Sequence, residues 1–259
     1  MIQYQTETIE KQLQQIADML VLNGTLTECP GLVHGKMGIS IFFFHYAKFT
    51  ANELFADYAM DVIGKMLDQI HVNSSADYEK GVAGIGMGFN YLIRNSFLLA
   101  DDDIFEDFDA RMRRAVMCEQ CSDFSLYGGL TGYGRYWISR LCYRAPEVWA
   151  RESLSYITDQ IENKFNTITL EEKTDVVYFL SDLRQISGFE KRSSELIEQF
   201  LMIRGAQTSN KTKLYEKQIS NLDMEKAPTD MGLLNGYAGE GMLRLTALDE
   251  TNMSWVNLL

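Results

Sequence analysis

The chain has 259 residues, of which 46% are hydrophobic, so it can bury a large core. Its formal net charge of −12 excludes nucleic acid as an expected partner, because phosphate binding needs a basic surface, and it argues equally against an anionic membrane. The start of the chain has no basic segment followed by an apolar one, so we expect no signal peptide and a cytoplasmic location.

Two kinds of helix alternate along the chain. Residues 7–22, 52–70 and 102–120 carry apolar residues three and four positions apart with charges on the opposite face, which predicts amphipathic helices. Between them lie glycine-rich segments that are apolar on most faces and are therefore predicted to be buried. The apolar run Ile39–Phe44 is too short to span a bilayer and is interpreted as the core of such an inner helix.

The glycine-rich segments share the pattern Gly-x-x-Gly-x-Gly/Ser, followed by an apolar helix. The spacing between the first three copies is nearly equal, and that between the third and the fourth is about twice as long. The gap predicts a degenerate, glycine-free copy near residues 175–186, and residues 204–230 are predicted to form a long loop with one outer helix. The paired glycines are Gly35 and Gly38, Gly81 and Gly84, Gly129 and Gly132, and Gly236 and Gly239.

This alternation predicts helical hairpins packed side by side, either as an open solenoid or closed into a ring. Only glycine lets backbones approach closely, so we expect the glycines to let inner helices converge at one end. The favoured fold is therefore all-α: an α/α toroid (barrel) of about five hairpins in a single domain, residues 1–259, with full closure left open.

In a toroid, residues just before and after the start of each glycine helix would line the mouth of a central cavity. Helix N-termini converging there favour a carboxylate or carbonyl ligand. One hypothesis makes His34 and Glu79 an acid–base pair; the alternative makes each a helix cap or loop contact. The other predicted mouth residues are Lys80, Tyr127, Tyr133, Asp230, Asn235, Tyr237 and Glu240.

Two aspartates suggest a different chemistry. Asp123 and Asp230 precede the third and fourth copies, and paired carboxylates at a rim would suit glycan cleavage. Aspartates at loop-to-helix junctions are more often caps, which is the alternative.

The cysteines and remaining histidines predict no metal or redox site. Cys118 and Cys121 are expected on one side of a helix, without a second pair or a nearby histidine. Cys29 and His34 lack an evident third ligand. His45 and His71 are placed on helical stretches, where a structural role is expected.

The segments "GLVHGKMGI", "GVAGIGMGFNYLI", "YGGLTGYG" and "GLLNGYAGEGMLRL" resemble the glycine repeats of the lanthionine synthetase C-like family. The resemblance covers nearly the whole chain. It implies an α/α toroid, although the chain has fewer hairpins than typical members. In the cyclases of that family, zinc activates a peptide cysteine thiol, which adds to a dehydrated serine or threonine and closes a thioether ring.

The family's zinc ligands are a cysteine in one repeat and an adjacent cysteine and histidine in another. When the glycine repeats of this chain are aligned with those of the family, the three zinc-ligand positions hold Tyr127, Leu234 and Asn235. Leucine cannot coordinate zinc, and neutral phenol and amide oxygens are poor ligands, so no cofactor is expected. Three hypotheses remain: a zinc-free relative that binds a peptide or partner, a metal-independent hydrolase or lyase acting on a glycan or peptide, and a structural assembly module.

Overall fold

The structure, a computed structural model, describes residues 2–99, 105–142, 146–202 and 230–259. Within these ranges it is helical and contains no β-strand, which confirms the all-α class. Its contacts form two compact units. The first holds the described residues up to 71, residues 91–99 and residues 230–259; the second holds residues 72–90 and the described part of 105–202.

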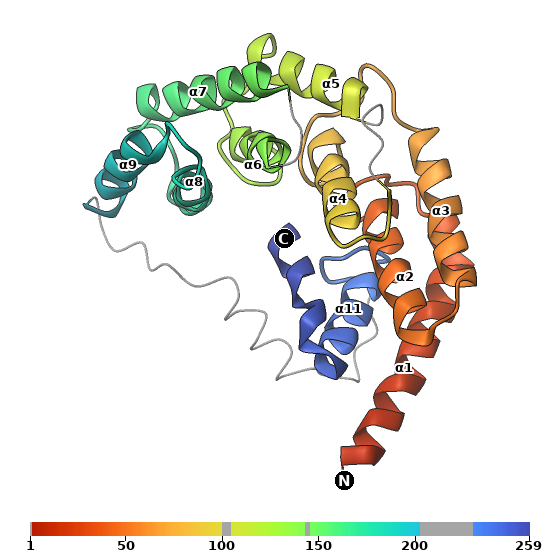
Figure 1. Ribbon diagram of the computed structural model, residues 1–259. Helices are drawn as coiled ribbons and strands as arrows, with labels where there is room; N and C mark the ends of the chain where they lie inside the picture. Colours follow the sequence, from red (N-terminus) through yellow and green to blue (C-terminus); the bar gives the residue numbers. More distant parts are fainter. Residues whose placement is uncertain (1, 100–104, 143–145, 203–229) are drawn as a thin grey trace. The chain divides into compact units, whose positions relative to one another are not determined.

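In the first unit, the last glycine helix lies beside the first one. Here α1 (Ile2–Asn23) and α2 (Lys36–Thr50) both pack against α11 (Tyr237–Leu248), and α2 also packs against α3 (Leu54–Leu67) (Figure 1). The short helices η1 (Gly24–Leu26) and η3 (Glu250–Leu258) complete the unit. Every residue of α2 from Lys36 to Ala47 is buried, which confirms the predicted core around Ile39–Phe44.

The second unit repeats a hairpin arrangement. Its α6 (Leu130–Leu141) packs against α7 (Glu147–Asn163), and α8 (Leu170–Leu183) packs against α9 (Glu190–Met202). Figure 1 shows α6 and α8 side by side, with α7, α9 and α5 (Glu106–Met117) on their outer side. The remaining helix, α4 (Val82–Arg94), begins in this unit and ends in the first. The predicted alternation of buried glycine helices and outer helices is thus present within each unit.

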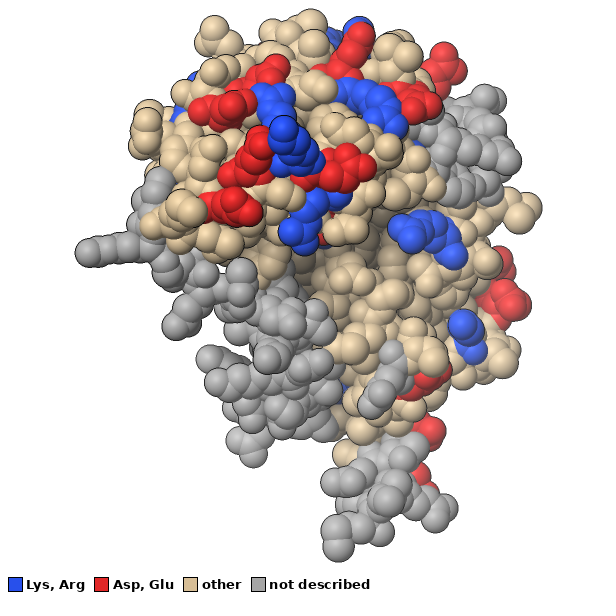
Figure 2. Space-filling model, turned by 60° about the vertical axis from the view of Figure 1, so that its left-hand side comes forward, with Lys and Arg blue, Asp and Glu red and all other residues tan. Residues whose placement is uncertain are grey.

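Acidic and basic side chains alternate on the outer helices of the second unit (Figure 2). Arg192 of α9 pairs with Asp159 of α7 at 2.7 Å, and Arg113 of α5 pairs with Glu152 of α7 at 2.9 Å. Exposed pairs of this kind stabilise a fold by at most about 1 kcal/mol each. They indicate a solvent-exposed face on which neither positive nor negative charge predominates.

A loop folds back over the start of each glycine helix. In all four copies, the N–H of the residue after the first glycine donates to a carbonyl at the beginning of the preceding loop. We call these loops, residues 29–35, 75–81, 123–129 and 230–236, the glycine loops. The bonds are Lys36 N to Cys29 O (3.0 Å), Val82 N to Ser75 O (2.9 Å), Leu130 N to Asp123 O (2.9 Å) and Tyr237 N to Asp230 O (2.9 Å).

This geometry corrects the predicted reason for the glycines. A Cβ on Gly129 would lie 2.4 Å from Asp123 O, and one on Gly132 would lie 2.1 Å from Leu126 O, both in the loop of the same copy. The first two glycines of a copy therefore make room for its own loop rather than for a neighbouring helix backbone. Only the third glycine faces another helix: a Cβ on Gly134 would lie 2.2 Å from the Phe179 ring.

The glycine-free copy exists, but it starts earlier than the predicted 175–186. Helix α8 begins at Leu170 behind a capping box of Thr169 and Glu172. In its first turn, Lys173 N donates to Thr169 O at 3.0 Å, whereas the first turns of the glycine helices donate to a carbonyl of the preceding loop. The long loop predicted at 204–230 lies outside the described residues, except for Asp230.

Candidate functional site

The glycine loops hold one another through paired backbone hydrogen bonds. In each unit, two successive N–H groups of one loop donate to a single carbonyl oxygen of another. The donating residues occupy equivalent positions in the second and fourth copies, and the accepting residues occupy equivalent positions in the third and first. The fourth loop therefore contacts the first in the same way as the second contacts the third. The distances are 2.9 and 3.2 Å from Tyr78 N and Glu79 N to Tyr127 O, and 2.8 and 3.1 Å from Leu233 N and Leu234 N to Val33 O.

The first unit brings two predicted site residues together. His34 Nδ1 lies 3.0 Å from Asp230 Oδ2, and the two side chains are 28% and 40% exposed. The other carboxylate oxygen of Asp230 accepts hydrogen bonds from Met231 N at 2.6 Å and Gly232 N at 3.3 Å, which fixes its orientation. A partly exposed histidine beside a fixed carboxylate is an arrangement suited to general acid–base chemistry.

The other predicted residues of the first unit have local roles. Asn235 is exposed and has a φ of 57°, a left-handed conformation that asparagine tolerates in turns. Glu240 pairs with the buried Arg244 one turn along α11, and Arg244 Nε also contacts Gln12 Oε1 of α1 at 3.3 Å. Glu240 thus belongs to the packing of α11 on α1. Tyr237, half-buried, begins α11.

The second unit holds the remaining predicted residues. Lys80 Nζ lies 3.5 Å from Glu79 Oε1, with the lysine side chain 59% exposed. Tyr127 is half-buried in its loop, and Tyr133, in the first turn of α6, is 9% exposed. Burial, with the nearby thiol of Cys121, raises the pKa of Tyr133 to about 12, so its hydroxyl remains a hydrogen-bond donor at neutral pH.

Two predicted pairs are divided between the units. His34 and Asp230 lie in the first unit, whereas Glu79 and Asp123 lie in the second, so the pairs His34–Glu79 and Asp123–Asp230 stay predictions. Locally, Asp123 Oδ1 accepts a hydrogen bond from Ser125 N at 2.7 Å, and Asp230 makes similar turn bonds. Both aspartates therefore stabilise the start of their own glycine loops, and neither is a helix N-cap, because Gly129 and Gly236 occupy that position.

The residues at the zinc-ligand positions that the resemblance implies do not fit the metal. Leu234 has no donor atom in its side chain, and the backbone N–H of Leu234 is used by Val33 O. Tyr127 and Asn235 offer only neutral oxygens. Among the described residues, no three histidine, cysteine or acidic side chains are grouped as metal ligands.

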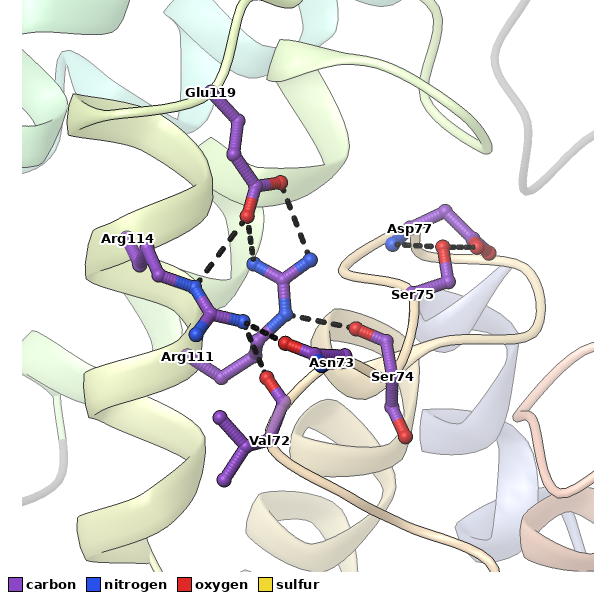
Figure 3. Close-up of polar contacts among 8 residues, drawn as sticks. All are labelled: Val72, Asn73, Ser74, Ser75, Asp77, Arg111, Arg114 and Glu119. Atoms are coloured by element: carbon purple, nitrogen blue, oxygen red, sulfur yellow. Dashed lines mark hydrogen bonds and ion pairs between the residues drawn. The ribbon is translucent and has the colours of Figure 1, made fainter.

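One polar cluster was not predicted from the sequence. Two arginines of α5 hold residues 72–74, which lead into the second glycine loop (Figure 3). Arg111 Nε donates to Ser74 O at 2.7 Å, and its two Nη atoms pair with Glu119 at 2.9 and 3.2 Å. Arg114 donates to Val72 O and to Asn73 Oδ1. Arg111 and Ser74 lie 37 residues apart, so no local pattern signals the contact.

His45 has the structural role predicted for it. Its Nδ1 lies 3.2 Å from Asn252 Oδ1 and its Nε2 lies 2.7 Å from Tyr91 Oη, all within the first unit. Burial lowers the pKa of His45 to about 4, so the ring is neutral at pH 7. His71 was wrongly placed on a helix: it is exposed and lies beyond the end of α3.

The prediction that two cysteines share a helix face is also wrong. Cys118 is the exposed C-cap of α5, and Cys121 lies in the non-helical segment after it. Neither forms a disulfide bond, and neither do Cys29 and Cys142.

A surface pocket lies at the C-terminal end of α6, the end opposite its own glycine loop. Leu141, Arg151 and Gln185 are among its lining residues, and none of the predicted site residues lines it. Arg151 there already pairs with Glu147 at 2.8 Å and donates to Ser187 O at 2.8 Å.

No protein-family model matches the chain, and a search of curated proteins found no match. None of the helices in the described ranges has both the length and the apolar character needed to cross a bilayer.

Proposed function

We propose that the chain is a zinc-independent relative of the lanthionine synthetase C-like proteins, folded as a single α/α toroid over residues 1–259. Its glycine loops bind a peptide or a partner protein and do not cyclise it. The observation that carries this proposal is the set Tyr127, Leu234 and Asn235, which replaces zinc ligands on loops that keep the repeat geometry.

A closed ring is supported by the contact between the first and last copies. In an open solenoid, each repeat contacts only its neighbours in the sequence. Here α11 packs on α2, and the paired bonds to Val33 O match those to Tyr127 O between consecutive copies. The last copy therefore contacts the first as a following repeat would.

Peptide binding is supported by the side chains on the glycine loops and the first helical turns. Tyr127 in the second unit and Tyr237 in the first are half-buried, and each combines an apolar ring with a hydroxyl, a combination common in peptide-binding surfaces. The net charge of −12 favours an unfolded segment of net positive charge, which would be drawn to the protein at low salt.

Fluorescence anisotropy with three labelled, unstructured peptides of equal length and positive, neutral or negative net charge tests this proposal. We expect the positive peptide to bind, more weakly at high salt, and Tyr127→Ala to weaken its binding about tenfold, the loss of one well-packed aromatic contact. Tyr156→Ala, on the outer helix α7, is the control and should bind normally. No binding of any peptide, or equal loss in both variants, would contradict the proposal.

A second function, that of a metal-independent hydrolase or lyase, is favoured by the His34–Asp230 pair. The carboxylate beside Nδ1 would orient the imidazole ring, which would take or give a proton at Nε2. The substrate class would be a peptide or a glycan.

Chromogenic peptide anilides and nitrophenyl glycosides, assayed with a chelator present, test the second function. Release of the chromophore by the wild type, and its loss in His34→Gln, would support it. The control His71→Gln, an exposed histidine outside the glycine loops, should remain active. A wild type without activity on any substrate of the panel would remove this candidate.

A further inference from the structure

The third glycine loop, which carries Tyr127, is held from α8 by two carboxylates. Phe124 N donates to Glu172 Oε1 at 2.9 Å, and Leu126 N donates to Asp175 Oδ2 at 2.8 Å. On its other side, Tyr127 O accepts the two bonds from Tyr78 and Glu79. The backbone around Tyr127 is thus restrained from both sides.

The position of α8 in the repeat register explains these contacts. The ring of Phe179 fills the space over Gly134, as the ring of Tyr136 does over Gly86 and that of Phe42 over Gly241. Phe179 therefore aligns with Tyr136, and Glu172 and Asp175 fall where the other copies have their first and second glycines. The copy without glycines carries carboxylates in their place.

The carboxylate of Asp175 accepts a loop N–H hydrogen bond that a loop carbonyl accepts in the other copies. Leu126 N occupies the same position as Tyr78 N and Leu233 N, which donate to the loop carbonyls of Tyr127 and Val33. Because α8 begins with an extra helical turn, no folded-back loop offers a carbonyl to Leu126. The side chain of Asp175 reaches it from the helix, and a charged acceptor makes the stronger hydrogen bond.

Glu172 is itself held in place. Its Oε2 accepts hydrogen bonds from Thr169 N at 2.8 Å and Thr169 Oγ1 at 2.7 Å, so one carboxylate both caps α8 and binds the third loop. Burial favours its neutral form, but the hydrogen bonds from Phe124 and Thr169 outweigh this and lower the pKa of Glu172. The carboxylate is ionised at neutral pH.

We infer that Asp175 and Glu172 are positioning residues for the peptide-binding surface, and that they act by fixing the backbone around Tyr127. The effect of these residues on peptide binding rests on the proposed function. The restraint of the loop does not depend on that function.

Amide hydrogen exchange of residues 123–129, together with peptide anisotropy, tests the inference on the full chain. In Asp175→Ala, the Leu126 amide should exchange about tenfold faster, as expected for loss of a hydrogen bond to a charged group. Peptide affinity should fall with it. Asp175→Asn keeps an oxygen acceptor and should recover part of both effects, whereas Glu171→Gln, the exposed neighbour of Glu172, should change neither.

A double variant separates positioning from direct contact. If Asp175 acts through Tyr127, Asp175→Ala should weaken peptide binding no further in a Tyr127→Ala background, yet it should still speed exchange at Leu126. Unchanged exchange at Leu126 in a folded Asp175→Ala variant would overturn the inference. Normal peptide affinity despite faster exchange would overturn it too. A wild type that binds no peptide would contradict the proposed function, while the exchange result would still decide whether the carboxylates restrain the loop.

Discussion

Gly132 lies where the third glycine loop crosses the first turn of α6. A Cβ there would meet Leu126 O at 2.1 Å and the Cβ of Tyr78 at 2.8 Å, and neither atom is the far end of a flexible side chain that could move aside. We expect Gly132→Ala to lower the free energy of unfolding, measured in urea, by about 2 kcal/mol, because the loop must lift off the helix.

Gly64 is the matched control for Gly132. It lies exposed on α3 with an ordinary φ, and a Cβ added to it would have no neighbouring atom within 4 Å. Gly64→Ala should raise the free energy of unfolding by up to about 1 kcal/mol through helix propensity alone. Similar effects of the two substitutions would contradict the loop explanation of the repeat glycines.

His45 makes the free energy of unfolding depend on pH. Its pKa is about 4 in the folded chain against 6.5 for the free group, so between these values the unfolded chain binds more protons. Stability therefore falls as the pH drops from about 6.5 to about 4, by about 3 kcal/mol in total, and is fully present above that window.

Urea unfolding of wild type and His45→Gln at several pH values measures this contribution. The variant should lack that part of the pH dependence, because glutamine does not titrate. An NMR titration that places the His45 imidazole near its ordinary pKa would contradict the explanation.

At the residue scale, the sequence indicated which residues lie on the glycine loops but not their partners. His34 and Asp230 were both candidates, yet their contact joins the first loop to the last and has no local signature. Tyr127 was identified through the register of the repeats. Its restraint by Glu172 and Asp175 was missed because those residues belong to the copy that lost its glycines.

At the element scale, α5 and α6 are joined by a buried ion pair. Arg140 Nη2 lies 2.8 Å from Asp109 Oδ2, Tyr136 Oη also donates to Asp109, and both charged side chains are at most 5% exposed. Removing one charge leaves the other buried and unpaired. We expect Asp109→Leu to cost about 3–5 kcal/mol of unfolding free energy.

The double variant Asp109→Leu/Arg140→Met tests whether the unpaired charge of Arg140 causes this loss of stability. It should be more stable than Asp109→Leu alone, because no unpaired charge remains in the core. A double variant that is less stable than the single one would show that the cost has another origin, such as lost packing beside Phe105.

The helices themselves could largely be predicted, for a physical reason. A glycine that precedes an apolar run marks both the fold-back of the loop and the helix start, so α2, α4, α6 and α11 begin directly after Gly35, Gly81, Gly129 and Gly236. Helix α8 lacks that signal, and its start was placed too late. The capping box of Thr169 and Glu172 was the available signal for it.

At the scale of the whole molecule, two features support the proposed function. The first is the equivalence of the loop contacts at Val33 in the first unit and Tyr127 in the second, which supports the proposed ring. The second is the presence of Tyr127, Leu234 and Asn235 at the positions that the resemblance assigns to zinc ligands, which supports the proposal of binding without metal chemistry. A requirement for zinc in binding would contradict the proposed function.

The most direct test measures the affinity for the positively charged peptide twice, once with a chelator and once with added zinc, and determines the metal bound in each sample by elemental analysis. The proposal predicts the same affinity in both conditions and no stoichiometric zinc. Peptide binding that requires zinc, with one zinc retained per chain, would contradict it.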